Sequence, residues 1–185
     1  MDMRQTGEML ARYALLALIP LGGMAVLYII FTPLTVYPVY WALKWMYTDA
    51  LLLGTTTLYI QGQYATIVAA CVAGAAYYLL LILNLTTPLP LLKRMKSLVF
   101  ILAVFLFLNI LRIAVFARLL VTGANYFDIA HQMTWYFGST VLVIIVWFAN
   151  VLLFDIKEIP VYTDVVTLIR EIRGTQIGPS GASSK

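Results

Sequence analysis

The sequence has little charge. Only 11% of its 185 residues are Asp, Glu, Lys or Arg, 63% are hydrophobic, and the mean hydropathy is +0.94. This composition excludes an ordinary soluble domain, in which about a quarter of the residues are charged. The alternating segments of about ten residues that build an outer-membrane barrel are absent, whereas apolar runs of about 20 residues are present. We therefore expect an all-α integral membrane protein.

Cysteine and histidine are equally scarce, with one of each, Cys71 and His131. A single cysteine excludes an intramolecular disulfide, and one Cys with one His cannot form a closed set of metal ligands. No glycine-rich phosphate loop is present, and the basic residues lie at the ends of apolar runs. We expect no cofactor, no metal and no nucleic-acid partner. Cys71 is either a small buried hydrophobe or a reactive thiol.

The apolar runs predict one membrane domain, residues 1–154, followed by a cytoplasmic tail, residues 155–185. Pro33 and Pro38 predict a break in any continuous helix, and the aromatic residues around them favour the membrane interface. We expect an outer interfacial segment there and a four-helix transmembrane bundle around it. The spans of this bundle are predicted at about residues 13–31, 71–89, 97–117 and 132–154.

The densest positive cluster, Lys93, Arg94 and Lys96, is predicted to lie in a cytoplasmic loop, because such clusters favour the inner side of a membrane. Four spans place both termini on that side and Cys71 on the extracytoplasmic side. The alternative is a fifth span at residues 33–53, which would move the basic cluster to the outside.

Residues 55–70 are rich in Thr, Tyr, Ile and Val and centre on Gln61-Gly62, where glycine can supply the positive φ of a tight turn. They predict a short β-hairpin that leads directly into Cys71. A helix is expected to start at Ala73 and to end before Pro88. The free amide groups at such a helix start would favour the anionic form of a nearby thiol.

Two polar residues stand in the third span. Arg112 lies about 22 Å past Ser97 at helical rise, within one or two turns of the outer surface of a hydrocarbon core of about 30 Å. It is expected either to face the interior of the bundle or to snorkel to the headgroups. Asn109, one turn earlier on the same face, either orients the guanidinium or bonds a neighbouring helix.

His131 opens the fourth span at the same outer level and is the side chain best suited to proton transfer near neutral pH. Asp128, three residues earlier, either caps that helix or fixes the imidazole tautomer, and the cap is the preferred interpretation. Ser139 and His131 are a conceivable hydrolase pair, although nothing around Ser139 indicates an activated nucleophile. Cys71, Arg112 and His131 together supply a thiolate, an oxyanion-stabilising cation and an acid–base group, which acyl transfer requires.

The runs IVAACVAG, LNILRIAVF and DIAHQMTWYF follow in this order on successive spans. With these separations the chain resembles, over roughly residues 54–154, the exosortase/archaeosortase family of membrane cysteine transpeptidases. The segment GTTTLYIQGQYATIVAAC is similar to the compact members, and LNLTTP favours the archaeal branch. The family's catalytic Cys, Arg and His correspond to Cys71, Arg112 and His131. Many members have a small polar residue and glycine directly after the cysteine, whereas here Val72 and Ala73 precede the supporting candidate Gly74.

The resemblance implies processing of exported proteins that end in a recognition motif, a transmembrane helix and a basic tail. Cys71 would form a thioester with the substrate at the extracytoplasmic face of the cell membrane, and a lipid amine or other surface acceptor would release the product. Two alternatives stay open. One is a non-catalytic membrane module, such as a small transporter or assembly subunit that binds anionic lipid. The other is an intramembrane cysteine protease that transfers its product to water.

Overall fold

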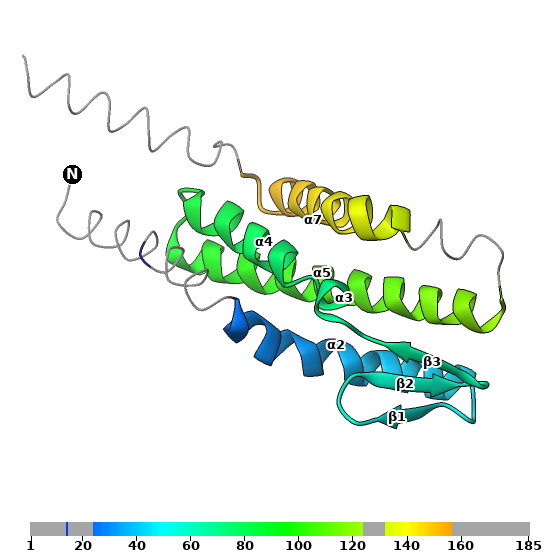
Figure 1. Ribbon diagram of the computed structural model, residues 1–185. Coiled ribbons are helices and arrows are strands. Elements are labelled where there is room, and N and C mark those ends of the chain that lie inside the picture. Colours follow the sequence, from blue (N-terminus) through cyan, green and yellow to red (C-terminus); the bar gives the residue numbers. More distant parts are fainter. Residues whose placement is uncertain (1–13, 15–23, 124–131, 157–185) are drawn as a thin grey trace, which may run out of the picture.

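The computed structural model describes residue 14, residues 24–123 and residues 132–156. These residues are mostly helical and carry one small sheet (Figure 1). In chain order the elements are α2 (Ala25–Met46), β1 (Leu51–Leu53), β2 (Thr57–Ile60), β3 (Gln63–Thr66), α3 (Ala69–Val72), α4 (Gly74–Thr86), α5 (Leu91–Val121), the π-helical turn η1 (Thr134–Gly138) and α7 (Ser139–Leu153).

Three helical stretches are long and apolar enough to cross a membrane: Ala25–Met46, Ala69–Thr86 and Leu91–Val121. Ser139–Leu153 is apolar but shorter. Helix α5, with 31 residues, extends over about 46 Å and is longer than a hydrocarbon core of about 30 Å. The predicted helical class is thus confirmed, with three helices that could span a membrane. The four-span count and the first span at 13–31 stay predictions, because most of that span lies outside the described residues.

Helix α2 runs without interruption through Pro33 and Pro38, so the predicted break there is wrong. Proline removes one backbone N–H, but tertiary packing can outweigh this local cost. One face of α2 beside the prolines is fully buried, with Val36 and Val39 on it, whereas Leu34 and Tyr37 on the other side are exposed. The helix closes instead at Met46, where Lys44 donates from Nζ to the carbonyl oxygens of Thr48 and Ala50, at 3.1 Å each.

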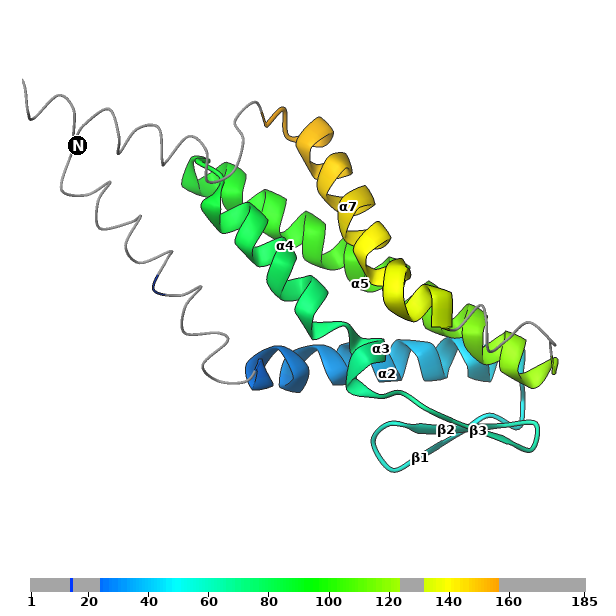
Figure 2. The same ribbon diagram turned by 45° about the horizontal axis from the view of Figure 1, so that its top comes forward.

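The sheet is antiparallel, with strand order β1-β2-β3, and it lies beside the end of the bundle at which α2 and α5 finish (Figures 1 and 2). The predicted hairpin is confirmed: β2 and β3 pair across a turn at Gln61 and Gly62, with φ of 47° and 83°. Both values are positive, as a two-residue type I′ hairpin requires. Strand β1 was not predicted, because a run of leucines carries no strand period.

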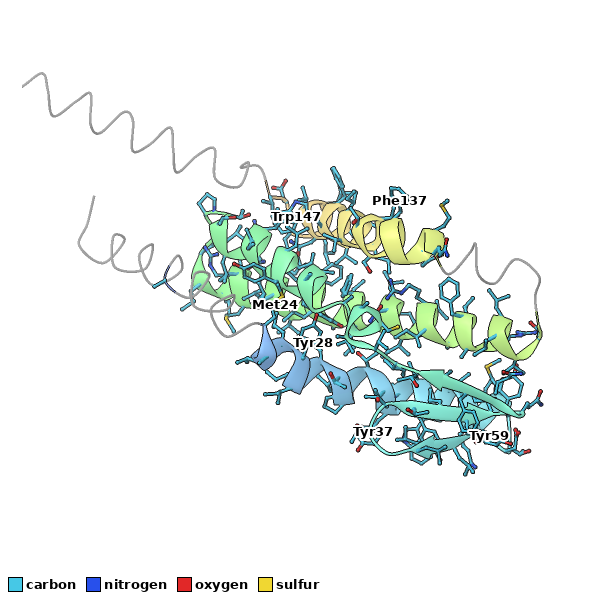
Figure 3. All side chains as sticks on the ribbon, in the orientation of Figure 1. Met24, Tyr28, Tyr37, Tyr59, Phe137 and Trp147 are labelled. Carbon is cyan, nitrogen blue, oxygen red and sulfur yellow. The ribbon has the colours of Figure 1, made fainter. Side chains whose placement is uncertain are left out.

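The cysteine segment differs from the predicted single helix. A short helix, α3, contains Cys71 and ends at Val72. Its C-cap Ala73 has a left-handed φ of 61°, and α4 then starts at Gly74. Gly74 lies where α4 meets α2. A Cβ there would lie 2.8 Å from Cζ of Tyr28, which sits where α2 passes this junction (Figure 3).

The basic cluster is not in a loop, because α5 already begins at Leu91. Arg94 is buried and donates hydrogen bonds to four carbonyl oxygens at and beyond the end of α4, at 2.8–3.2 Å: those of Asn84, Leu85, Thr87 and Leu89. Arg94 thereby satisfies carbonyls that a helix end leaves without intrahelical partners. In this cluster only Lys93 and Lys96 are then left to indicate which side of the membrane the segment faces.

Aromatic and polar contacts hold the helices together. The buried ring of Tyr77 on α4 stacks on Phe31 of α2 at 3.7 Å between centroids and meets Phe105 of α5 edge-on at 4.8 Å. A buried polar chain joins three helices, because Asn84 of α4 donates to Ser97 of α5 at 2.6 Å and Ser97 donates to Asn150 of α7 at 2.8 Å. Such interhelical bonds are the usual specific contacts inside membrane bundles.

Candidate functional site

Cys71 is half-buried and lies in α3, which packs against both α2 and α5. Its amide N–H donates to the carbonyl oxygen of Val68 at 2.8 Å, which fixes the backbone of the first helical turn. The residue lines a cavity of about 290 Å³ between β3 and the second half of α5. The thiol is thus carried by a constrained backbone beside open space.

The left-handed backbone of Ala73 interrupts the helical hydrogen bonds here: the amide of Ala76, which in a continuous helix would bond Val72, bonds the carbonyl oxygen of Ala73 instead. Helix α5 supplies donors to this segment. Asn109 donates from Nδ2 to the carbonyl oxygens of Cys71 and Val72, at 3.0 and 3.4 Å. Of the two predicted roles, Asn109 therefore has the second: it bonds a neighbouring helix.

Arg112 lies one turn after Asn109 and is held from two sides. Its Nη2 donates to the carbonyl oxygen of Cys71 at 3.2 Å, and its Nη1 donates to Oγ of Ser139 at the start of α7 at 2.8 Å. The guanidinium therefore faces the bundle and does not snorkel to the headgroups. It lies next to the residue that carries the sulfur.

Ser139 and Gly138 were not predicted as parts of this arrangement, although Ser139 was considered as a hydrolase residue. Ser139 accepts a hydrogen bond from Arg112 and so positions it. A Cβ on Gly138 would lie 3.9 Å from Nη1 of Arg112 and 2.5 Å from Cγ2 of Thr134. A side chain at this position would therefore clash with Thr134 and crowd the guanidinium. A lone serine at the start of a highly apolar helix is the sequence signal that could have indicated this role.

A groove of about 520 Å³ runs between α5 and the η1–α7 segment, and Arg112 is its one charged lining residue. The other lining residues are apolar, small or hydroxyl-bearing: Leu108, Leu111, Val115, Phe116, Met133, Thr134, Phe137, Gly138, Val141 and Leu142. Phe137 projects from the outer side of η1 and is 65% exposed (Figure 3). The groove therefore opens on the outer surface of these helices.

No carboxylate of the described part of the chain neutralises Arg112. That part contains two, Asp49 and Asp155. Asp49 accepts from the amide of Gln61 at the hairpin turn, at 2.8 Å. Asp155 follows α7, and its carbonyl oxygen accepts from Lys93 in the first turn of α5. A buried cation without a carboxylate partner among the described residues can hold a bound or developing negative charge.

Two predicted site residues, His131 and Asp128, lie outside the described residues, and Gln132 begins the next described segment. The structure thus brings together Cys71, Asn109 and Arg112, places Gly74 against Tyr28 of α2, and leaves the placement of His131 a prediction. Within the described ranges no three His, Cys, Asp or Glu side chains form a group that could hold a metal ion.

Comparison of the chain with protein-family models, with curated proteins and with solved structures gives no match.

Proposed function

We propose that this protein is a membrane cysteine transpeptidase that processes the C-terminal sorting signals of exported proteins, as its resemblance to the exosortase/archaeosortase family implies. One observation carries the proposal. Residues Cys71 and Arg112, 41 positions apart, meet because the guanidinium of Arg112 bonds the carbonyl oxygen of Cys71 itself. A nucleophile and an oxyanion-stabilising cation on separate helices are what acyl transfer requires.

In the proposed reaction the thiolate of Cys71 attacks the carbonyl carbon of the scissile peptide bond. The carbonyl oxygen becomes an oxyanion, which N–H groups of Arg112 stabilise. Guanidinium carries five N–H donors, and two are engaged by Cys71 and Ser139, so donors remain for substrate. The C–N bond then breaks as His131 protonates the leaving amine, and a thioester on Cys71 results.

An acceptor amine next attacks the thioester carbonyl, His131 takes up the proton, and the thiolate of Cys71 leaves. A lipid or other surface amine would thereby become the new anchor of the exported protein. Arg112 lies 16 residues after Lys96, about 24 Å along α5 at helical rise. If Lys93 and Lys96 face the cytoplasm, this distance supports a site at the extracytoplasmic face of the cell membrane.

The experiment is co-expression with a tagged exported protein of the same cells that ends in an apolar helix and a basic tail. Wild type converts it to a shorter form, whereas Cys71→Ser, which leaves the backbone bonds of Cys71 in place, should give none. Conversion by Cys71→Ser would contradict the proposal. Mass analysis of the released product distinguishes transfer to an acceptor from hydrolysis, which is the outcome for a simple intramembrane protease.

One observation favours the second candidate, a non-catalytic module that binds anionic lipid. The apolar groove beside Arg112 opens laterally and contains a cation without a described carboxylate partner. An acyl chain in the groove with its phosphate on Arg112 would satisfy both features. In this case the biological activity of the protein survives Cys71→Ser and depends on Arg112 alone.

A further inference from the structure

Strand β3 is an edge strand. It pairs with β2 on one side, and the strand order β1-β2-β3 leaves its other side without a strand from the described residues. Residues Ile60 and Gln63 flank the two-residue turn and so form a hydrogen-bonded pair, and these pairs recur at every second residue. The bond from the amide of Ile67 to the carbonyl oxygen of Thr56, 2.9 Å, shows the same alternation.

This alternation decides which backbone groups are free. Gln63 and Ala65 direct their N–H and C=O groups to β2, and Tyr64 and Thr66 direct theirs to the open edge. Such unpaired edge groups are a template for another extended chain. The free edge ends five residues before Cys71.

The cavity at Cys71 lies along this edge. Tyr64, Ala65 and Thr66 all line it, followed by Ile67 and Cys71, and Leu58 of β2, the partner of Ala65, lines it too. Side chains of successive strand residues point to opposite faces of a sheet, so a cavity that touches three in a row reaches the edge of β3 as well as the face that carries Leu58 and Ala65. The opposite wall is α5, with Ile113, Phe116, Ala117 and Leu120.

We propose that the substrate peptide binds by adding an extended strand to the β3 edge, through the backbone groups of Tyr64 and Thr66, and thereby delivers its scissile bond to Cys71. The inference rests on the proposed function and specifies how its substrate is recognised. Backbone pairing of this kind holds a peptide in extended form and does not depend on the peptide's sequence. The walls of the cavity then determine which side chains fit. Continuity of the edge with the nucleophile identifies the occupant as a peptide.

Thr66→Pro tests this without disturbing the hairpin. Proline removes the N–H that faces the open edge, a position at which edge strands tolerate it, and the ladder bonds of Gln63 and Ala65 stay in place. Thr66→Val is the matched control, because it retains the N–H and removes only the hydroxyl, which lies 3.2 Å from that of Thr57. The probe is acetyl-Ala-Val-Ala chloromethyl ketone, which alkylates a thiol with loss of chloride, and iodoacetamide reports the thiol without peptide binding.

We expect Thr66→Pro to slow alkylation of Cys71 by the peptide probe about tenfold relative to Thr66→Val, as loss of about one backbone hydrogen bond predicts. Alkylation by iodoacetamide should be equal in the two variants. Equal alkylation rates of the two variants with the peptide probe would overturn the inference. It would also be overturned if two copies of the chain cross-linked to each other at β3 and Thr66→Pro abolished this cross-link, because the edge would then bind a second copy. Neither alkylation rate depends on substrate turnover. A negative result in this experiment is therefore distinct from failure of the proposed function, which the Cys71→Ser experiment tests.

Discussion

Asn109→Leu tests whether the side chain of Asn109 holds the cysteine-bearing helix in place. The substitution removes the Nδ2 donor to Cys71 and Val72. The carbonyl of Cys71 keeps its bond to Arg112, so the carbonyl of Val72 is the group that loses its partner. A buried orphaned carbonyl costs about 1–3 kcal/mol. Part of this is offset, because Oδ1 of Asn109 is itself buried without a partner among the described residues and disappears with the substitution.

A net cost of about 1.4 kcal/mol corresponds to a tenfold larger population of the opened state of α3. Hydrogen–deuterium exchange measures this at the amides of Cys71, Val72 and Ala73, which bond to Val68 and Ala69 in the closed state. We expect exchange there to accelerate about tenfold.

The matched control is Asn84→Leu at the other end of α4. Asn84 is equally buried, donates from Nδ2 to Ser97 and also has an Oδ1 without a partner in the described part of the chain. Its substitution should leave exchange in α3 within about twofold of wild type. Equal acceleration in both variants would refute the reasoning, since the effect would then reflect general destabilisation.

Three further predictions concern the same framework. Gly74→Ala should lower the free energy of unfolding by about 1–2 kcal/mol, because the added Cβ meets the ring of Tyr28. This loss should vanish when Tyr28 is replaced by Ala, and an unchanged loss in that background would exclude the contact as its cause. Arg94→Met should lower the free energy of unfolding by about 3 kcal/mol in unfolding titrations, because four carbonyls lose their donor. The control Lys96→Met, at an exposed residue, should lower it by less than about 0.5 kcal/mol, and similar losses in both variants would contradict the capping role of Arg94. Arg112→Lys should reduce processing about 100-fold while iodoacetamide labelling of Cys71 stays within a few-fold, because lysine cannot bond Ser139 and Cys71 and an oxyanion together; full activity would exclude oriented contact.

Local patterns predicted some features of the fold and not others. The apolar runs at 71–89 and 97–117 and the Gln61-Gly62 turn are local signals, and they predicted helices and a hairpin at these places. The continuity of α2 through Pro33 and Pro38 depends on burial against other helices, which no local pattern reports. The role of Arg94 likewise depends on the chain folding back after Thr86, so that carbonyls 5–10 residues earlier come within reach.

The site follows the same division. The spacing of Asn109 and Arg112 placed both on one face of a helix, as observed. Their shared partner could not be predicted, because the carbonyl of Cys71 becomes available only through the left-handed backbone of Ala73, a residue type without a signal for positive φ. Ser139 was identified as polar, and its bond to Arg112 requires the packing of α5 on α7.

Trapping of the covalent intermediate tests the central claim, that Cys71 is an acylating nucleophile. Purified wild type is mixed with the tagged sorting-signal protein, quenched in acid and analysed by intact mass and peptide mapping. The account predicts an acyl adduct on Cys71 that hydroxylamine removes and that Cys71→Ser does not form. Processing of the substrate with Cys71 unmodified throughout would contradict it.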